Sequence, residues 1–189
     1  MKIGVLAIQG AFLEHEQILD KLGFNWVEIR KREDISGIDG LILPGGESTV
    51  QGKLLHELDM FKPLKEKIEN GLPVLATCAG LILLSRNIVN DENRYFGTLP
   101  VTIRRNAYGR QIGSFRTRQP LKGFDNFDMV FIRAPYIEAV DEDVEILAEV
   151  DHHIVAVQYK NQIGLSFHPE LSNDYRIHQY FLDLISERI

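Results

Sequence analysis

The chain has 189 residues and one cysteine, Cys78. An apolar run at 74–76 precedes it and the small residues Ala79 and Gly80 follow it, a pattern typical of a buried strand that turns sharply into a helix. A side chain at such a turn points out above the sheet, and the first amides of the helix favour a thiolate there. The sequence therefore predicts a cysteine nucleophile. The alternative for a lone cysteine is a buried structural thiol.

His168 and Glu170 form a second candidate pair. They lie two positions apart just after an apolar run, so strand alternation directs both side chains to one face, and Pro169 stiffens the backbone between them. A carboxylate beside an imidazole orients the ring and stabilises its protonated form, which prepares a base for a nucleophile. Together with Cys78 the pair predicts a nucleophile, base and carboxylate triad. The alternative is a surface histidine next to an ordinary loop acid.

A third segment, residues 43–49, places Gly45 and Gly46 directly after another apolar run. Two glycines let the main chain approach a ligand closely, and their amides can point at a developing oxyanion. The segment does not match a phosphate-binding P-loop, because Leu54 stands where that pattern needs Ser or Thr after Gly-Lys. A plain turn is the alternative to an oxyanion site.

The strands and helices that position these residues are predicted by short apolar runs that alternate with helical patterns. The first part of the chain predicts strands at 3–8, 25–29, 40–43 and 73–76 and helices over 12–22 and 61–70, which end at Gly23 and Gly71. Strands separated by helices imply right-handed crossovers and a parallel sheet with helices on both faces. The strand ends of such a sheet gather in one crevice, where the candidate residues would meet.

The second part of the chain is rich in strands. Short apolar runs follow one another at 101–103, 129–132, 144–150, 154–159 and 163–167, with hairpin connections at 151–153 and 160–162 and a final helix that carries apolar residues at 177, 181, 184 and 185. The fold class predicted is α/β, with three layers, a mostly parallel central sheet covered by helices on both sides, and a β-rich second half. No linker or repeat interrupts it, so residues 1–189 are expected to form one domain.

Composition excludes several function classes. The formal net charge of −6 argues against general nucleic-acid binding, which needs lysines and arginines to neutralise phosphates. One cysteine forms no internal disulfide, which favours a reducing cytoplasm. No segment is long enough to span a membrane, and Gln9 interrupts the first apolar run before signal-peptide length. No metal site is expected, because the remaining histidines lack ligand spacing: His15, His56, His152, His153 and His178.

Three motifs, in this order, resemble the signatures of class I, triad-type glutamine amidotransferases: residues 43–48, 77–80 and 166–171. More narrowly, the runs 8–10, 45–49, 105–111 and 131–135 are similar to those of the glutaminase subunits of two-component pyridoxal 5′-phosphate synthases. The likeness covers nearly the whole chain. One departure is Ala76, where glycine is usual in the broader family. The resemblance implies a flavodoxin-like arrangement of the α/β fold.

The resemblance also implies roles for individual residues. Cys78, His168 and Glu170 would form the triad, and backbone amides at Gly46 and Ala79 would hold the oxyanion. The residues implied to line the glutamine site are Gly46, Glu47, Ser48, Arg105, Ile132 and Arg133. The implied activity is hydrolysis of L-glutamine to L-glutamate and ammonia, with the ammonia delivered to a pyridoxal 5′-phosphate synthase subunit in a large hetero-oligomer. No cofactor is needed, because pyridoxal 5′-phosphate is the product of that complex.

The resemblance further predicts that the free chain is weakly active and that Gln9 and the 45–46 peptide lie near the partner contact. Two other enzymes share parts of the pattern. One is the glutaminase subunit of another synthase, such as imidazole glycerol phosphate synthase, against which Ala79 and the 105–111 run count, because leucine is typical there after the nucleophile. The other is a peptidase-like cysteine hydrolase, against which the 168–170 motif counts. A binding subunit that keeps only the fold is disfavoured by the complete set of triad residues.

Overall fold

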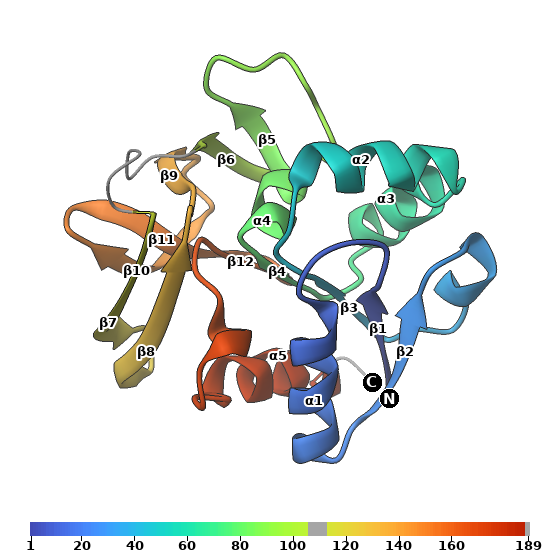
Figure 1. Cartoon of the computed structure of the whole chain (residues 1–189), viewed down its shortest axis with the longest axis horizontal. Helices are drawn as coiled ribbons and strands as arrows, with labels where there is room; N and C mark the ends of the chain where they lie inside the picture. The colour runs from blue at the N-terminus through green and yellow to red at the C-terminus, as the bar shows by residue number, and fades with distance from the viewer. Residues whose placement is uncertain (106–112, 188–189) are drawn as a thin grey trace.

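The computed structural model describes residues 1–105 and 113–187. Its central feature is a ten-stranded sheet with the order β2-β1-β3-β4-β12-β11-β9-β6-β5, in which β10 also pairs with β11 (Figure 1). The strands of this sheet are β1 (Lys2–Leu6), β2 (Asn25–Ile29), β3 (Gly40–Leu43), β4 (Val74–Thr77), β5 (Ser85–Ile88), β6 (Leu99–Arg104), β9 (Tyr136–Val140), β10 (Glu145–Val150), β11 (His153–Tyr159) and β12 (Gln162–Leu165).

Two further strands and seven helical segments complete the described chain. A two-stranded antiparallel ribbon consists of β7 (Ser114–Leu121) and β8 (Phe124–Ile132). The helical segments are α1 (Phe12–Leu22), η1 (Arg32–Ile35), α2 (Ser48–Glu57), α3 (Phe61–Glu69), α4 (Ala79–Leu84), η2 (Pro169–Leu171) and α5 (Arg176–Ser186), of which η1 and η2 are short 3-10 turns.

The strands β2, β1, β3, β4 and β12 are parallel to one another, as the sequence predicts. Apart from the edge strand β2, which is mostly half-buried, these strands are buried on both faces. Leu41 and Leu43 of β3 pack into one hydrophobic core and Ile42 into the other. Such strands read as continuous apolar runs because helices cover both faces. The first strand ends at Leu6, two residues earlier than predicted, and the chain then enters the loop that contains Gln9.

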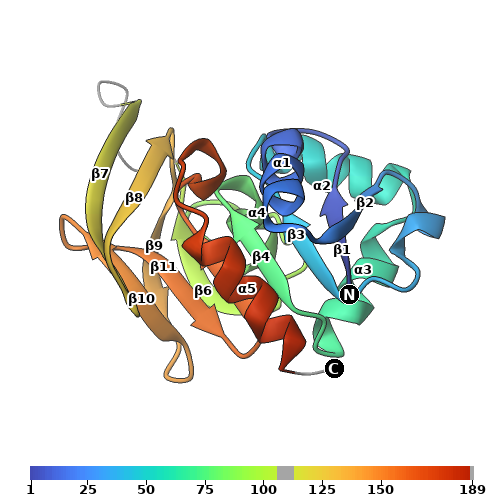
Figure 2. The ribbon, with the colours of Figure 1, turned by 90° about the horizontal axis from the view of Figure 1, so that it is seen from below.

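Helices α1 and α5 cover one face of the sheet, and α2, α3 and α4 cover the other (Figures 1 and 2). Helix α1 ends as predicted at Gly23, whose φ of 75° lets its N–H return to the carbonyls of Asp20 and Leu19. Helix α2 was not predicted, because Thr49, Val50 and Gly52 weaken the helical pattern there. This helix begins directly at the glycine loop.

In the second half, the hairpins at 151–153 and 160–162 are confirmed as the β10–β11 and β11–β12 connections. The apolar run 129–132 lies in β8, which pairs with β7 at one end of the molecule instead of joining the central sheet (Figure 2). The sequence did not predict β5, β7 or β9. Strand β7 alternates exposed and half-buried residues, so it lacks the apolar run of a core strand. Within the described residues no helix has the length and hydrophobicity needed to cross a bilayer.

Candidate active site

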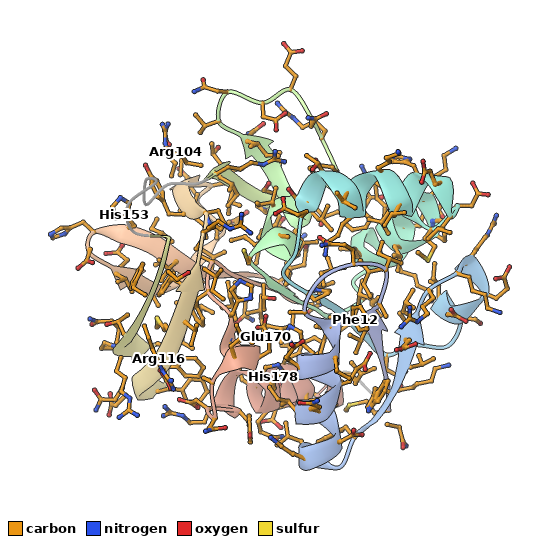
Figure 3. The ribbon with its side chains drawn as sticks, viewed as in Figure 1. Phe12, Arg104, Arg116, His153, Glu170 and His178 are labelled. Carbon is orange, nitrogen blue, oxygen red and sulfur yellow. The ribbon has the colours of Figure 1, made fainter. Side chains whose placement is uncertain are left out.

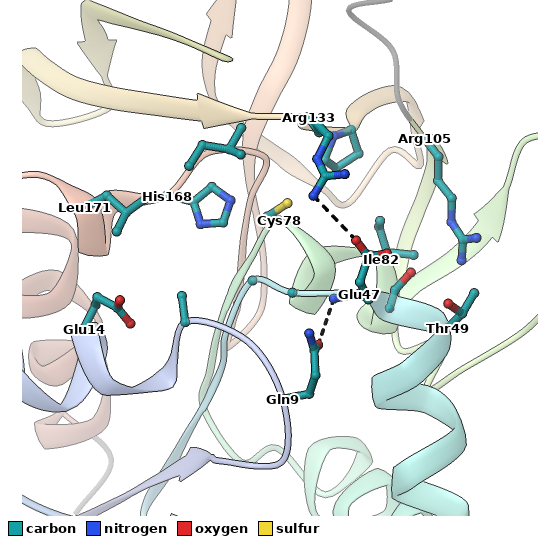
Figure 4. A pocket seen from close by; sticks show the side chains of 16 residues that line it. Gln9, Glu14, Glu47, Thr49, Cys78, Ile82, Arg105, Arg133, His168 and Leu171 are labelled. Carbon is teal, nitrogen blue, oxygen red and sulfur yellow. Dashed lines mark hydrogen bonds and ion pairs between the residues drawn. The ribbon is translucent and has the colours of Figure 1, made fainter. Parts of the chain in front are cut away.

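The carboxyl ends of β1, β3, β4 and β12 meet at one edge of the sheet, where a cleft of about 650 Å³ opens (Figure 4). Eight of the predicted site residues line this cleft: Gly46, Glu47, Ser48, Cys78, Arg105, Ile132, Arg133 and His168. The other two lie just outside it. Glu170 is buried next to His168, and Ala79 is the first residue of α4. The fold thus gathers residues from widely separated parts of the sequence.

Cys78 lies at the turn between β4 and α4, where the sequence predicts a nucleophile. Its φ of 47° and ψ of −101° are unusual for a side-chain-bearing residue, and such strained geometry is common at functional turns. The Cys78 N–H donates to the Leu165 carbonyl at 2.8 Å, which ties this turn to β12. A Cβ on Gly80 would lie 2.1 Å from the Leu43 carbonyl oxygen, so only glycine lets α4 pack this closely on β3.

His168 follows β12 and lines the cleft (Figure 4), with its ring next to the backbone of the glycine loop at Gly45. Its N–H donates to the Val130 carbonyl at 2.8 Å, so the β7–β8 ribbon fixes the main chain at this point. The Nδ1 atom lies 2.6 Å from Oε1 of Glu170, and both side chains are buried. With Nδ1 engaged by the carboxylate, Nε2 is the ring nitrogen that remains for the sulfur of Cys78.

The charge environment of His168 favours the imidazolium form. Burial alone lowers its pKa, but the side-chain hydrogen bond with Cys78 and the hydrogen bond and charge of Glu170 outweigh burial and raise the pKa to about 10. An imidazolium next to a thiol stabilises the anionic, nucleophilic form of the sulfur. The arrangement therefore favours a protonated imidazole next to the sulfur.

Gly45 lies against both of these side chains. A Cβ built on it would be 2.3 Å from Cε1 of His168 and 3.4 Å from Cβ of Cys78. The glycine loop is held by its surroundings: the Gly45 carbonyl accepts the Ala11 N–H at 3.0 Å, and Oε1 of Gln9 accepts the Glu47 N–H at 2.8 Å. The backbone of this loop is therefore close enough to the sulfur to contact a reacting group.

Buried Gln51 of α2 also supports the loop, by donating from Nε2 to the Gln9 and Pro44 carbonyls at 3.0 and 3.3 Å. Sequence reasoning missed Gln51, because nothing in a helical glutamine distinguishes it from a surface residue until the partner backbone is placed.

Charged side chains form the rim of the cleft. Nη2 of Arg133 lies 3.8 Å from Oε1 of Glu47, and both side chains are largely exposed (Figure 4). Nη1 of Arg105 lies 3.0 Å from Oδ2 of Asp91. Nη2 of Arg105 donates a hydrogen bond to the Tyr95 hydroxyl at 3.3 Å. Opposite charges at one mouth suit a small zwitterion, because each end of such a ligand meets its counter-charge. The remainder of the predicted 105–111 motif, residues 106–111, lies outside the described residues.

Two buried histidines behind the triad were not predicted to belong to the site. His15 of α1 approaches Glu170 with 3.5 Å between Nε2 and Oε2, and its Nδ1 lies 2.9 Å from Nε2 of His178 in α5. The two histidines are 163 positions apart in the chain, so their spacing carries no signal. Within residues 1–105 and 113–187, no group of three or more His, Cys, Asp and Glu side chains is arranged to hold a metal ion.

Comparison with known sequences agrees with this geometry. The profile of the SNO glutamine amidotransferase family matches residues 5–187. The chain belongs to this family. As a family member, it is a glutamine amidotransferase, and the resemblance seen in its three motifs is confirmed.

Relatives of this amidotransferase are similar over their full length. A "Pyridoxal 5'-phosphate synthase subunit PdxT" of Desulfitobacterium hafniense is 65% identical over 98% of this chain and 94% of its own length. The protein of the same name from Streptococcus pneumoniae is 53% identical over 100% of this chain and 99% of its own.

Solved structures support the same assignment. One described as a glutamine amidotransferase superposes with a TM-score of 0.93 at 42% identity, covering 97% of this chain and 98% of that one. Another, from Thermoplasma acidophilum and described as a GMP synthase subunit protein, has a TM-score of 0.70 at 19% identity, covering 100% of this chain and 95% of that one. At this identity it shows the shared fold alone. The predicted class I amidotransferase fold is therefore confirmed.

Proposed function

We propose that this chain is the glutaminase subunit of a pyridoxal 5′-phosphate synthase. It hydrolyses L-glutamine to L-glutamate and ammonia and delivers the ammonia to a separate synthase subunit. The observation that carries the proposal is the meeting of Cys78, His168 and Glu170 at the strand ends of an amidotransferase fold whose full-length relatives are named as subunits of that synthase.

The proposed chemistry begins with attack of the Cys78 sulfur on the side-chain carboxamide carbon of glutamine. A C–S bond forms, and the carbonyl π electrons move to oxygen, where backbone amides near Gly46 and Ala79 stabilise the charge. The tetrahedral intermediate then collapses, the C–N bond breaks, and His168 gives its proton to the leaving nitrogen, which departs as ammonia. The product of this half-reaction is a glutamyl thioester.

In the second half-reaction the now neutral His168 takes a proton from water, and the resulting oxygen nucleophile attacks the thioester. Breakage of the C–S bond releases glutamate and regenerates the thiolate and imidazolium pair. Glu170 holds the ring orientation through Nδ1 in both steps, at the observed distance of 2.6 Å. All of these steps use side chains and backbone of this chain, so we propose that the glutaminase reaction requires no cofactor or metal.

The rim supports recognition of free glutamine. Arg133 and Arg105 offer cations for the α-carboxylate, and Glu47 offers an anion for the α-ammonium group. The ion pair between Glu47 and Arg133 is exposed, so a substrate that satisfies both charges displaces it at little cost. Ile132 and Ser48 complete the proposed glutamine site along the cleft wall.

The proposed partner is the synthase subunit of a hetero-oligomeric complex. Ammonia released into neutral water is largely protonated and no longer nucleophilic, so direct delivery to a second active site has a clear advantage. In this proposal pyridoxal 5′-phosphate is the product of the complex, the reaction takes place in the cytoplasm, and neither nucleic acid nor membrane takes part. Gln9, which binds the glycine loop, lies at the cleft where docking of the partner would act.

The test is to measure glutamate release by the purified chain with and without the synthase subunit from the same source. We expect weak activity alone, strong activation by the partner, and formation of pyridoxal 5′-phosphate when pentose and triose phosphates are supplied. A Cys78→Ala variant should bind the partner and release no glutamate. Turnover by that variant would remove Cys78 from its role, and a full rate without a partner would exclude activation by docking.

Three assays separate the other functions considered. A peptide panel compared with glutamine tests for a peptidase-like hydrolase, and labelling of Cys78 by a glutamine-like electrophile tests for a binding subunit without catalysis. Activation by the synthase subunit of imidazole glycerol phosphate synthase instead would assign the chain to a different complex. We expect glutamine as the substrate, covalent labelling, and activation only by the pyridoxal phosphate partner.

A further inference from the structure

A row of buried polar side chains continues behind the proposed triad. Glu170 contacts His168 through Oε1, while its other oxygen, Oε2, lies 3.5 Å from Nε2 of His15. Nδ1 of His15 in turn lies 2.9 Å from Nε2 of His178. Both histidines are 0% exposed. Glu170 and His178, which His15 connects, are labelled in Figure 3. The row thus links α1 and α5 to the site.

Burial favours the neutral form of both rings. Burial lowers the pKa of His178 to about 3. Burial, with a smaller contribution from the charges of His178 and His168, also holds the pKa of His15 well below its ordinary value. A neutral imidazole carries one N–H and one bare nitrogen, so the contact between the two rings needs one donor and one acceptor.

Two arrangements of hydrogens satisfy that contact. In the first, His178 donates from Nε2 to the bare Nδ1 of His15, and His15 then carries its hydrogen on Nε2, facing Oε2 of Glu170. In the second, His15 donates from Nδ1 to His178, and the bare Nε2 of His15 faces the carboxylate. In this second arrangement the bare Nε2 of His15 could accept a hydrogen bond from the hydroxyl of Thr77, whose Oγ1 lies 3.4 Å away.

Electrostatics favour the first arrangement. The second arrangement directs a nitrogen lone pair at a buried carboxylate oxygen, which repels it and leaves that oxygen without a donor. Among the described residues no group makes a hydrogen bond of ordinary geometry to Oε2 of Glu170. Nε2 of His15, 3.5 Å away, can supply the missing donor, and a buried anionic oxygen without a donor is costly. The first arrangement leaves bare only Nδ1 of His178, which has no partner among the described residues and, as an unprotonated acceptor, is the less costly group to leave unpaired.

We propose that His15 and His178 are positioning residues for the glutaminase reaction. His178 fixes His15 in the tautomer with hydrogen on Nε2, and His15 holds Oε2 of Glu170, so that the carboxylate remains an anion aimed at Nδ1 of His168. The inference rests on the proposed role of Glu170 in the triad. Neither histidine touches the substrate, since each lies on the far side of Glu170 from the cleft.

The first test reads the tautomers directly. In the full chain labelled with 15N-histidine, nitrogen shifts and N–H couplings distinguish a protonated from a bare ring nitrogen, and His15→Gln and His178→Gln spectra assign the signals. We expect both rings to carry hydrogen on Nε2 at neutral pH. A His15 ring protonated on Nδ1, or a charged ring at either position, overturns the proposal. This measurement needs no turnover, so its result is independent of whether the chain is a glutaminase.

The second test measures kcat and KM for glutamine in the complex with the synthase subunit. His15→Leu removes the donor and should lower kcat about ten-fold, the loss expected for a hydrogen bond to a charged group, with KM unchanged. His15→Gln restores an N–H near the same oxygen and should recover part of kcat. His178→Leu should show mixed tautomers of His15 and a smaller loss of kcat.

The outcomes of the second test separate the two proposals. Equal kcat for His15→Leu and His15→Gln, each folded by circular dichroism, would contradict a role for the N–H and leave packing as the only role of His15. Absence of glutamate release by the wild-type complex would instead contradict the proposed function, while the tautomer spectra would still report on the histidine row.

Discussion

Gly45 offers the sharpest test of the proposed site, because its missing side chain leaves room for the His168 ring. In a Gly45→Ala variant the new Cβ would lie 2.3 Å from Cε1 and 2.9 Å from Nδ1 of His168. Carbon atoms in contact prefer about 3.5 Å, so the ring or the loop must move by about 1.2 Å. A displacement of that size breaks the 2.6 Å hydrogen bond to Glu170 or the contact with Cys78.

We therefore expect Gly45→Ala to lower kcat about 100-fold, since misplacement of a catalytic group by about 1 Å has effects of this order. Overpacking of this kind destabilises by about 1–3 kcal/mol, which for a chain of this size lowers Tm by about 2–12 °C and leaves the variant folded at 25 °C. The assay is glutamate release by the complex with the synthase subunit, together with a thermal melt.

The matched control is Gly113→Ala, because a Cβ at Gly113 meets no atom of the described residues within 4 Å and needs no left-handed backbone. We expect its rate to stay within about two-fold of wild type, as for an ordinary surface substitution. A Gly45→Ala variant with wild-type kcat would show that His168 does not need its present position. Equal losses in both variants would show that the effect is not specific to the site.

The contacts at the rim, the triad and the last helix support three further predictions. Arg133→Ala should raise KM for glutamine about ten-fold and change the free energy of unfolding by less than about 1 kcal/mol, because its ion pair with Glu47 is exposed. Urea titrations should show that protonated His168, with its pKa raised to about 10, stabilises the fold fully below about pH 6.5 and loses this contribution as pH rises towards 10, relative to His168→Gln. Arg176→Lys should lower Tm and leave kcat unchanged, because the guanidinium bonds Asp174 and covers two phenylalanine rings, none of which lines the cleft.

Each of the three has an outcome that would contradict it. For Arg133→Ala it is an unchanged KM measured with saturating partner. For His168 it is a difference in unfolding free energy that stays constant or grows between pH 6.5 and 10. For Arg176→Lys it is a fall in kcat at a temperature where the variant is fully folded.

The local sequence was sufficient to predict the parallel half of the sheet and the residues at its strand ends. Strands buried on both faces appear as unbroken apolar runs, so β3 and β4 could be located without a structure. The same topology implies that their carboxyl ends meet, which brought the glycine loop and Cys78 to one cleft. The 168–170 motif was recognisable because histidine and glutamate lie two positions apart after a strand.

Other features depend on contacts between distant segments, so no local pattern of residues indicates them. Strand β7 is half exposed and is stabilised only by pairing with β8, and Gln51 becomes distinctive only when the Gln9 loop lies above it. The positive φ of Cys78 is also a property of the folded turn, imposed by β4 and α4 together.

The buried histidine row illustrates the difference most clearly. Residue types and spacing along the chain were sufficient to identify the family and to predict a nucleophile and its base, because each of those signals lies within a few consecutive residues. Only the tertiary structure decided that His15 and His178 stand behind Glu170, since α1 and α5 are brought together by packing on the same face of the sheet. Hydrophobic packing is not specific to partners along the sequence, so contacts of this kind emerge only when the whole core is assembled.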